Sequence, residues 1–222
     1  LLGKPGKTEQ GVLLKSYKNL VICHSHLEQH ALKIQTLERM MQALPKLPKA
    51  EISNVYAQMG DAYRALEIYA PASAAYDKAA HLLPQDADPR VRGRLLTAMG
   101  LCQGNLGDFA SASESLTQAK ELAARISEPL TLAESGSNLG ILYWERGDYP
   151  QALQLLNNSL ETERKNTLRR NEGVDLNNLG LVKKSMGYFP DAMRAFEDAL
   201  AIAREVGNVK DEAIALSNRA LL

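Results

Sequence analysis

The stretch GILYWERGDYPQA at residues 140–152 decides the fold, because its outline returns at a constant spacing along the chain. The same outline stands as GDAYRALEIYAPA at 60–72, GLCQGNLGDFASA at 100–112 and GLVKKSMGYFPDA at 180–192. Each copy opens on glycine, carries an aromatic residue at its tenth position and closes on alanine. Four copies without a register slip indicate an internal repeat, with units that begin near residues 53, 93, 133 and 173.

Two further positions repeat after the closing alanine of each copy. A large apolar or aromatic residue stands at Tyr76, Leu116, Leu156 and Phe196. A small residue follows at Ala79, Ala119, Ser159 and Ala199. Small residues let two antiparallel helices approach closely, and the large residue fills the space beside them. We therefore predict that each unit is a helix–turn–helix pair, stable only when it is stacked on its neighbours.

Glycine and proline mark the expected helix ends. Turn glycines stand at Gly107, Gly147 and Gly187, where they would end the first helix of a pair. Prolines open helices at the repeat spacing, at Pro89, Pro129, Pro150 and Pro190, because a missing N–H costs little in a first turn. The first unit departs from this pattern, with Glu67 at the place of the turn glycine.

These features resemble the tetratricopeptide repeat family. The 40-residue period is longer than the usual 34 and is similar to that of kinesin light chains and LGN-type adaptor arrays. The resemblance covers about residues 51–222, as four full repeats and the first helix of a fifth that starts from 213. It implies an all-α fold, a right-handed superhelical solenoid of antiparallel helix pairs.

Residues 1–50 fall outside the repeat register. Apolar side chains there have helical spacing, at Leu13, Leu14, Tyr17, Leu20 and Val21, and prolines follow at Pro45 and Pro48. We interpret 1–50 as a degenerate repeat or capping hairpin, with a flexible tail over residues 1–10 as the alternative. The chain starts at Leu1 and ends inside a periodic pattern, so we expect it to be a fragment of a longer protein.

The composition favours protein partners over nucleic acid or membrane. Lys+Arg and Asp+Glu both total 26, and residues 1–50 carry eight of the basic and three of the acidic side chains. A nucleic-acid binder shows a concentrated basic excess. No apolar run approaches the ~20 residues that span a bilayer. Only two cysteines, Cys23 and Cys102, are present, which favours a cytoplasmic compartment. A cytoskeletal or ciliary association is the narrower expectation.

No motif predicts catalysis, a metal site or a cofactor. Gly3-Lys4-Pro5-Gly6-Lys7-Thr8 places two residues between its glycines, whereas a phosphate loop needs four after a buried strand. His26 and His30 have a spacing that would put two metal ligands on one helix face, but we interpret them as solvated or packed histidines. The basic run at 164–170 is flanked by Glu161, Glu163 and Glu172, which indicates a solvated inter-repeat loop.

The family resemblance also implies a binding face. In this family the first helices of the pairs line a concave groove, and Asn138, Asn178 and Asn218 fall at the same groove position of successive units. A side-chain amide both donates and accepts, so such a ladder is expected to hold the backbone of an extended peptide. Ala98 breaks the ladder in the second repeat. The alternative is that these asparagines brace neighbouring helices.

Other groove positions surround the predicted ladder. Leu101, Ile141 and Leu181 form an apolar stripe. Trp144 is expected either to anchor a ligand or to pack against the next helix pair. Lys184 and Arg94 complete the predicted peptide-binding set. Because groove positions carry both signs of charge, neither an acidic nor a basic ligand is preferred.

These observations predict a scaffold or adaptor that binds a protein or peptide partner and forms part of a larger complex. We expect no enzymatic activity, cofactor or small-molecule substrate. The alternative function is a structural subunit docked into a cytoskeletal or ciliary assembly through convex faces and loops. A third possibility is that the groove is occupied in cis by the segment before residue 50.

Overall fold

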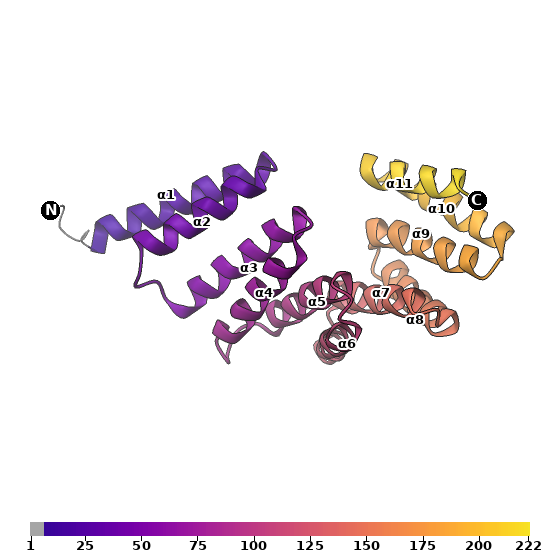
Figure 1. Ribbon diagram of the computed structural model, residues 1–222, viewed down its shortest axis with the longest axis horizontal. Coiled ribbons are helices and arrows are strands. Elements are labelled where there is room, and N and C mark those ends of the chain that lie inside the picture. The colour runs from indigo at the N-terminus through magenta and orange to yellow at the C-terminus, as the bar shows by residue number, and fades with distance from the viewer. Residues whose placement is uncertain (1–6) are drawn as a thin grey trace. The chain divides into compact units, whose positions relative to one another are not determined.

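The computed structural model describes residues 7–222, and every regular element in that range is an α-helix. The helices are α1 (Lys7–His26), α2 (His30–Ala43), α3 (Lys49–Ala65), α4 (Tyr69–Leu82), α5 (Pro89–Asn105), α6 (Phe109–Arg125), α7 (Pro129–Glu145), α8 (Tyr149–Lys165), α9 (Arg169–Ser185), α10 (Phe189–Glu205) and α11 (Val209–Ala220) (Figure 1). The predicted all-α class is therefore confirmed. Most of the segment 3–8, which was compared with a phosphate loop, and most of the possible flexible tail over residues 1–10 lie outside the described residues.

The turn between the two helices of a pair contains one residue in the left-handed region. Gly107, Gly147 and Gly187 have φ angles of 77°, 79° and 81°, as predicted for residues that end a first helix. Glu67 adopts the same conformation, with φ 59°, although a side chain is strained there. The packing of α3 against α4 therefore imposes the turn even where the residue type does not favour it.

The helix starts also follow the predicted punctuation. Pro150 and Pro190 lie in the first turns of α8 and α10, where no helical hydrogen bond is lost. Asp148 caps α8, and its side chain accepts a hydrogen bond from the backbone N–H of Gln151 at 3.2 Å. The local sequence thus marks where α8 begins, by its cap and its proline.

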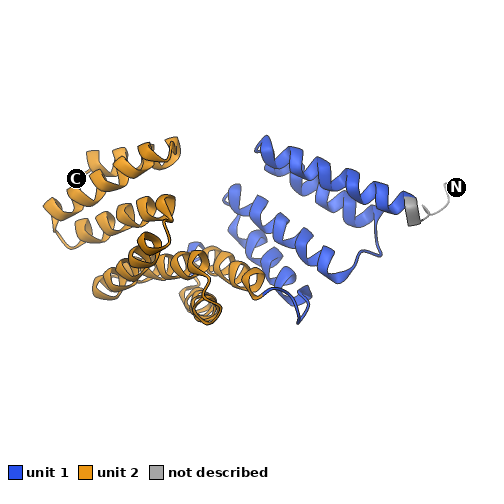
Figure 2. Cartoon of the chain, turned by 180° about the vertical axis from the view of Figure 1, so that it is seen from behind, with its two compact units in different colours: residues 1–88, 105–107 blue, residues 89–104, 108–222 orange. Residues whose placement is uncertain are grey.

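The chain forms two compact units, coloured separately in Figure 2. Unit 1 contains residues 7–88 of the described chain together with 105–107, and unit 2 contains 89–104 and 108–222. Each unit has its own apolar core. The core of unit 1 is built on α1–α4 and includes Val21, Leu37, Met40 and Met59. The largest core cluster of unit 2 comes from α8–α11 and includes Leu156, Leu179 and Leu200.

In both units, the repeat positions interlock as the sequence predicts. A Cβ atom added at Gly140 would lie 2.8 Å from Cγ of Leu156, and one added at Gly60 would lie 2.6 Å from the ring of Tyr76. The repeat alanines behave in the same way and are fully buried at Ala72, Ala112, Ala152 and Ala192. Glycine and alanine are therefore present because the two helices of a pair are in contact at these places.

The first helix pair, α1 and α2, has the same turn as the other units. Glu28 in its turn has φ 53° and takes the place that Glu67 has in the next unit. In the same register, Leu37 and Met40 take the places of Tyr76 and Ala79, and both are fully buried. Met40 thus fills a core position that holds a small residue in the other repeats. Val21 and Lys33 stand at the places of Gly60 and Ala72, and the offset is 39 residues instead of 40, so the register is hidden from sequence comparison.

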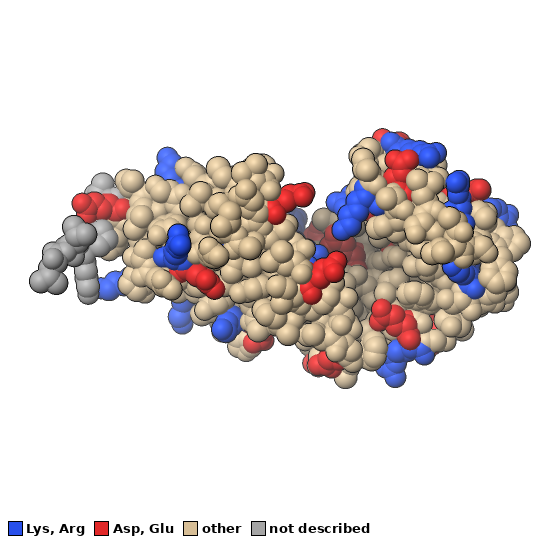
Figure 3. Space-filling view, turned by 45° about the horizontal axis from the view of Figure 1, so that its top comes forward, with Lys and Arg blue, Asp and Glu red and all other residues tan. Residues whose placement is uncertain are grey.

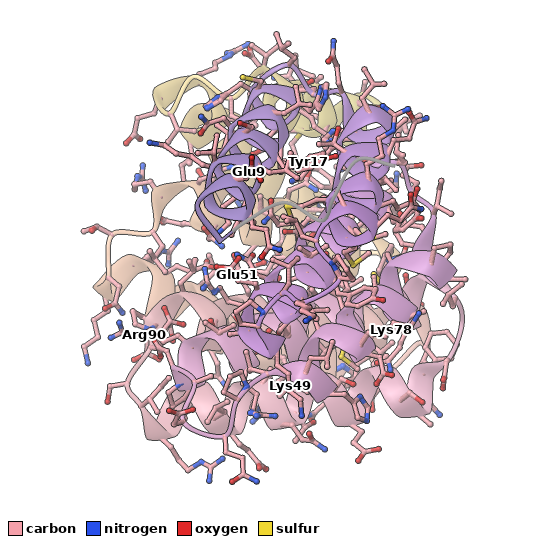
Figure 4. All side chains as sticks on the ribbon, turned by 90° about the vertical axis from the view of Figure 1, so that its left-hand side faces the viewer. Glu9, Tyr17, Lys49, Glu51, Lys78 and Arg90 are labelled. Atoms are coloured by element: carbon pink, nitrogen blue, oxygen red, sulfur yellow. The ribbon has the colours of Figure 1, made fainter. Side chains whose placement is uncertain are left out.

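Side-chain contacts join the helices of unit 1, and Figure 4 labels one partner of each, Glu51 on α3 and Lys78 on α4. Lys18 Nζ on α1 donates a hydrogen bond to Glu51 Oε1 on α3 at 2.8 Å. The ammonium group of Lys78 on α4 lies 5.3 Å from the ring centroid of Tyr56 on α3, a cation–π distance. Both contacts reach α3, one from α1 and the other from α4.

Candidate functional site: the first-helix face of unit 2

The first helices of successive repeats, α7, α9 and α11, contact one another through polar side chains. Trp144 Nε1 donates to Ser185 Oγ at 2.9 Å, and Lys184 Nζ donates to the carbonyl oxygen of Leu221 at 2.8 Å. Each contact joins two neighbouring repeats within unit 2, because its partners lie about one repeat period apart in the sequence. We call the surface that carries the predicted binding residues on α5, α7, α9 and α11 the first-helix face.

The three asparagines of the predicted ladder are half-buried on this face, but their contacts differ. Asn178 Nδ2 donates to Asp175 Oδ1 at 3.2 Å, and Asn218 Nδ2 donates to Asn177 Oδ1 at 2.9 Å. Among the described residues, the side-chain amide of Asn138 has no hydrogen-bond partner. Asn178 and Asn218 therefore brace neighbouring structure, whereas the amide of Asn138 is free for another molecule.

The remaining predicted residues lie beside the asparagines on the same helices. Leu101, Ile141 and Leu181 are each half-buried, so each leaves part of an apolar side chain accessible. Trp144 is also half-buried and packs against the main core cluster of unit 2, which favours the packing interpretation of its role. Arg94 is exposed on α5.

A cavity of about 180 Å³ opens between α9, α10 and α11. One wall carries Asn177 and Asn178, and apolar side chains that include Ile202 and Ile214 form much of the rest. Arg170 and Asp211, which form an ion pair at 3.3 Å, also line it. The cavity combines apolar surface with amide groups, as binding pockets do.

The structure reveals a buried acid pair that the sequence analysis missed. Glu163 on α8 and Asp175 on α9 are each only 1% exposed. Ser137 on α7 donates a hydrogen bond to Asp175, which Asn178 also contacts. Glu163 was expected in a solvated loop, and that expectation is wrong. A signal was available, since other repeats hold apolar residues at the place of Glu163.

The neighbouring arginines form ion pairs with carboxylates. Glu172 accepts from Arg164 at 2.8 Å and from Arg169 at 2.5 Å, and Arg169 also pairs with Glu205. On the face shown in Figure 3, basic and acidic side chains are interspersed rather than gathered by sign. The inter-repeat turn between α8 and α9 is thus an ion-pair network.

Two further observations concern residues 7–222 as described. No three His, Cys, Asp or Glu side chains in this range group as metal ligands would, and His24 Nδ1 lies 2.9 Å from Gln29 Oε1. None of its helices combines the length and apolar character that a membrane crossing needs.

The fold and its first-helix face define an α-helical repeat protein of the kind that is typically a scaffold for protein interactions. A family model for the tetratricopeptide repeat matches residues 91–165 and again residues 131–205, which together exceed half of the chain. The chain belongs to the tetratricopeptide repeat family, as the resemblance predicted. No match was found among curated proteins.

Solved structures show the same fold at low sequence identity. Aspartyl phosphate phosphatase F from Bacillus subtilis superposes with a TM-score of 0.83 at 11% identity, over 96% of this chain and 56% of the other. The Rap conjugation gene regulator of plasmid pLS20, in complex with the Phr* peptide, gives 0.75 at 17% identity, over 88% and 54%. The chain thus spans little more than half of either protein.

A Podospora anserina protein with nearly identical TPR-like repeats, of the kinesin light chain type, gives a TM-score of 0.67 at 17% identity. That match covers 87% of this chain and 96% of the other. The likeness to the kinesin light chain variant is therefore found in structure as well as in sequence.

Proposed function

We propose that this protein is an adaptor that holds an extended peptide segment of a partner protein on the first-helix face of unit 2. The observation that carries the proposal is the free side-chain amide of Asn138, half-buried on α7 with Ile141 of the predicted set three residues further along the same helix. A peptide backbone has both a donor and an acceptor at each residue, and a single amide side chain satisfies both.

The proposed division of labour follows the observed hydrogen bonds. Asn178 and Asn218 are held by the protein: Asn178 donates to Asp175 on its own helix and to Ser137 on α7, and Asn218 donates to Asn177 on α9. Asn138 makes the direct contact, and Leu101, Ile141 and Leu181 cover apolar side chains of the ligand. The pLS20 Rap regulator, which shares the fold and was solved with the Phr* peptide, supports a peptide as the ligand class.

The test is selection from a displayed library of random peptides on immobilised protein. We expect wild-type protein to enrich a peptide family and Asn138→Ala to lose at least about tenfold in affinity, which is roughly 1.4 kcal/mol. The matched control is Asn157→Ala, an exposed asparagine on the second helix α8, which should bind as wild type does. Equal binding by the two variants would contradict the proposed site.

The alternative function is a structural subunit held in a large assembly by its turns. Tyr188, which precedes α10, and Phe189, the first residue of α10, are 53% and 52% exposed, which favours a contact surface there. Selected peptides that lose affinity on Phe189→Ser but not on Asn138→Ala would support this alternative.

The proposal includes a non-enzymatic role, a cytoplasmic location and a domain division. In that division, residues 51–222 form the repeat array and residues 1–50 form an N-terminal cap. The α1–α2 pair supports the cap, because it contributes Val21, Leu37 and Met40 to the core that it shares with α3 and α4.

A further inference from the structure

We propose that Glu163 and Asp175 share one proton and make the contact between α8 and α9 a pH-sensitive joint, firm in mild acid and loosened in mild alkali. The proposal is independent of peptide binding. It concerns two buried side chains that do not contact the proposed ligand, although Asp175 accepts a hydrogen bond from Asn178.

The repeat pattern shows that these two carboxyl groups are exceptional. The place of Glu163 is apolar in the other units, at Leu83, Ala123 and Ala203. The place of Asp175 is uncharged in the other units, at Val55, Leu95, Ser135 and Ala215. Only the interface between the repeats that begin near residues 133 and 173 therefore has an acid at both core places.

The hydrogen bonds show where the proton belongs. As ionised carboxylates both groups only accept, so among the described residues both oxygens of Glu163 and one of Asp175 are left without a donor. Leaving buried polar atoms unpaired is costly. A proton on Glu163 makes it a donor to Asp175, whose other oxygen already accepts from Ser137 and Asn178.

The charged surroundings do not neutralise the pair. The charges that act on Glu163 are Asp175 and Glu172 on α9 and Arg164 on its own helix. Arg164 is already engaged by Glu172 at 2.8 Å. From α7 the facing group is the neutral hydroxyl of Ser137. No described cation is buried with the acids, so a shared proton is the available counter-charge.

The protonation equilibrium gives the direction of the pH effect. Burial, and then the negative charge of Asp175, raise the pKa of Glu163 to about 8, and burial also raises the pKa of Asp175. In the unfolded chain both groups ionise near pH 4. Between these limits the folded state binds more protons, so stability is highest in mild acid and declines until the pH exceeds about 8.

The experiment compares thermal unfolding of the full chain at pH 5.5, 7.0 and 8.5. We expect the wild-type Tm to fall by about 5–10 °C over this range. Glu163→Gln should show less than half of that fall, because its amide donates to Asp175 at every pH. The matched control is Glu161→Gln, an exposed acid on the same helix, which should follow wild type. An unchanged slope in Glu163→Gln would overturn the proposal.

A second measurement needs no substitution. Carbon-13 labelling of glutamate carboxyl groups lets the titration of Glu163 be followed by NMR in the wild-type chain. We expect one glutamate signal to titrate between pH 6 and 9, and that signal to be absent from Glu163→Gln. If every glutamate in the wild-type chain titrates below pH 5.5, Glu163 is ionised at neutral pH and the proposal is wrong.

Discussion

At the scale of single residues, the helix pairs depend on a few small side chains. Ala152 is fully buried and stands beside Gly140, whose added Cβ would come within 3.4 Å of the Ala152 carbonyl oxygen. The backbones of α7 and α8 lie close together there, so there is no room for a larger side chain. The sensitivity of the fold is concentrated at such places.

We predict that Ala152→Leu destabilises the protein by ~1–3 kcal/mol, because the larger side chain forces α7 and α8 apart. Urea denaturation followed by circular dichroism measures the loss. Gln154→Leu, an exposed position on the same helix, is the control and should change stability by no more than about 0.5 kcal/mol. Equal effects of the two substitutions would show that the pair is loosely packed.

The asparagines are predicted to differ in their effect on stability. Asn178→Ala removes the donor to Asp175 and should cost about 1 kcal/mol. Asn138→Ala removes no internal hydrogen bond and should leave the unfolding free energy within about 0.5 kcal/mol of wild type. The same denaturation measurement compares them. If Asn138→Ala destabilises the protein more than Asn178→Ala does, Asn138 and not Asn178 is the bracing residue, and the prediction is wrong.

At the scale of helices and turns, some elements carry local start and stop signals and others do not. Asp148 and Pro150 define the start of α8, and Gly147 relieves the strain of the preceding turn. Glu67 shows the converse case, a turn that forms without glycine. Local chemistry and pair packing thus specify the same boundaries, and packing prevails where they disagree.

We predict that Asp148→Ala weakens the protein by about 1 kcal/mol, because the N–H of Gln151 loses its cap. Asp148→Asn keeps an acceptor oxygen and should lose less than half as much. Thermal melting at pH 7 compares the two. If Asn and Ala cost the same, the cap contributes through its charge and not through its hydrogen bond.

Sequence reasoning recovered the repeated elements and left out what depends on pairing in space. The repeat spacing predicted the turns at Gly107, Gly147 and Gly187. It did not assign α1 and α2 to the register, because Val21, Lys33 and Met40 replace the small residues of the pattern and the spacing is 39 residues instead of 40. The contact between Glu163 and Asp175 could not be read from the pattern, since each acid looks like an isolated exception until α8 is placed against α9.

At the scale of the whole molecule, stability is distributed over two separate cores. Unit 1 has its cluster on α1–α4, and unit 2 has clusters that draw on α6–α11. In repeat proteins, stability is approximately a sum of unit and nearest-neighbour terms. The two units should therefore tolerate substitutions independently.

We predict that a fragment of residues 89–222 folds without residues 7–88 and unfolds cooperatively, because its core clusters contain no residue from 7–88. Circular dichroism and thermal melting test this expectation. The control fragment, residues 129–165, contains the single pair α7–α8 and should be largely unfolded. Loss of helicity in the longer fragment would show that the units depend on each other to fold.

The equal length of the helix pairs has a consequence for how the gene can change. From α5 to α10 all helices have the same length and alternate with turns of equal length, so every unit occupies an identical span of chain. An unequal crossover that adds or removes the coding sequence of one whole unit leaves all helices in phase. The lineage can therefore lengthen or shorten its array in single steps, whereas the Glu163–Asp175 pair survives only if its two units are inherited together.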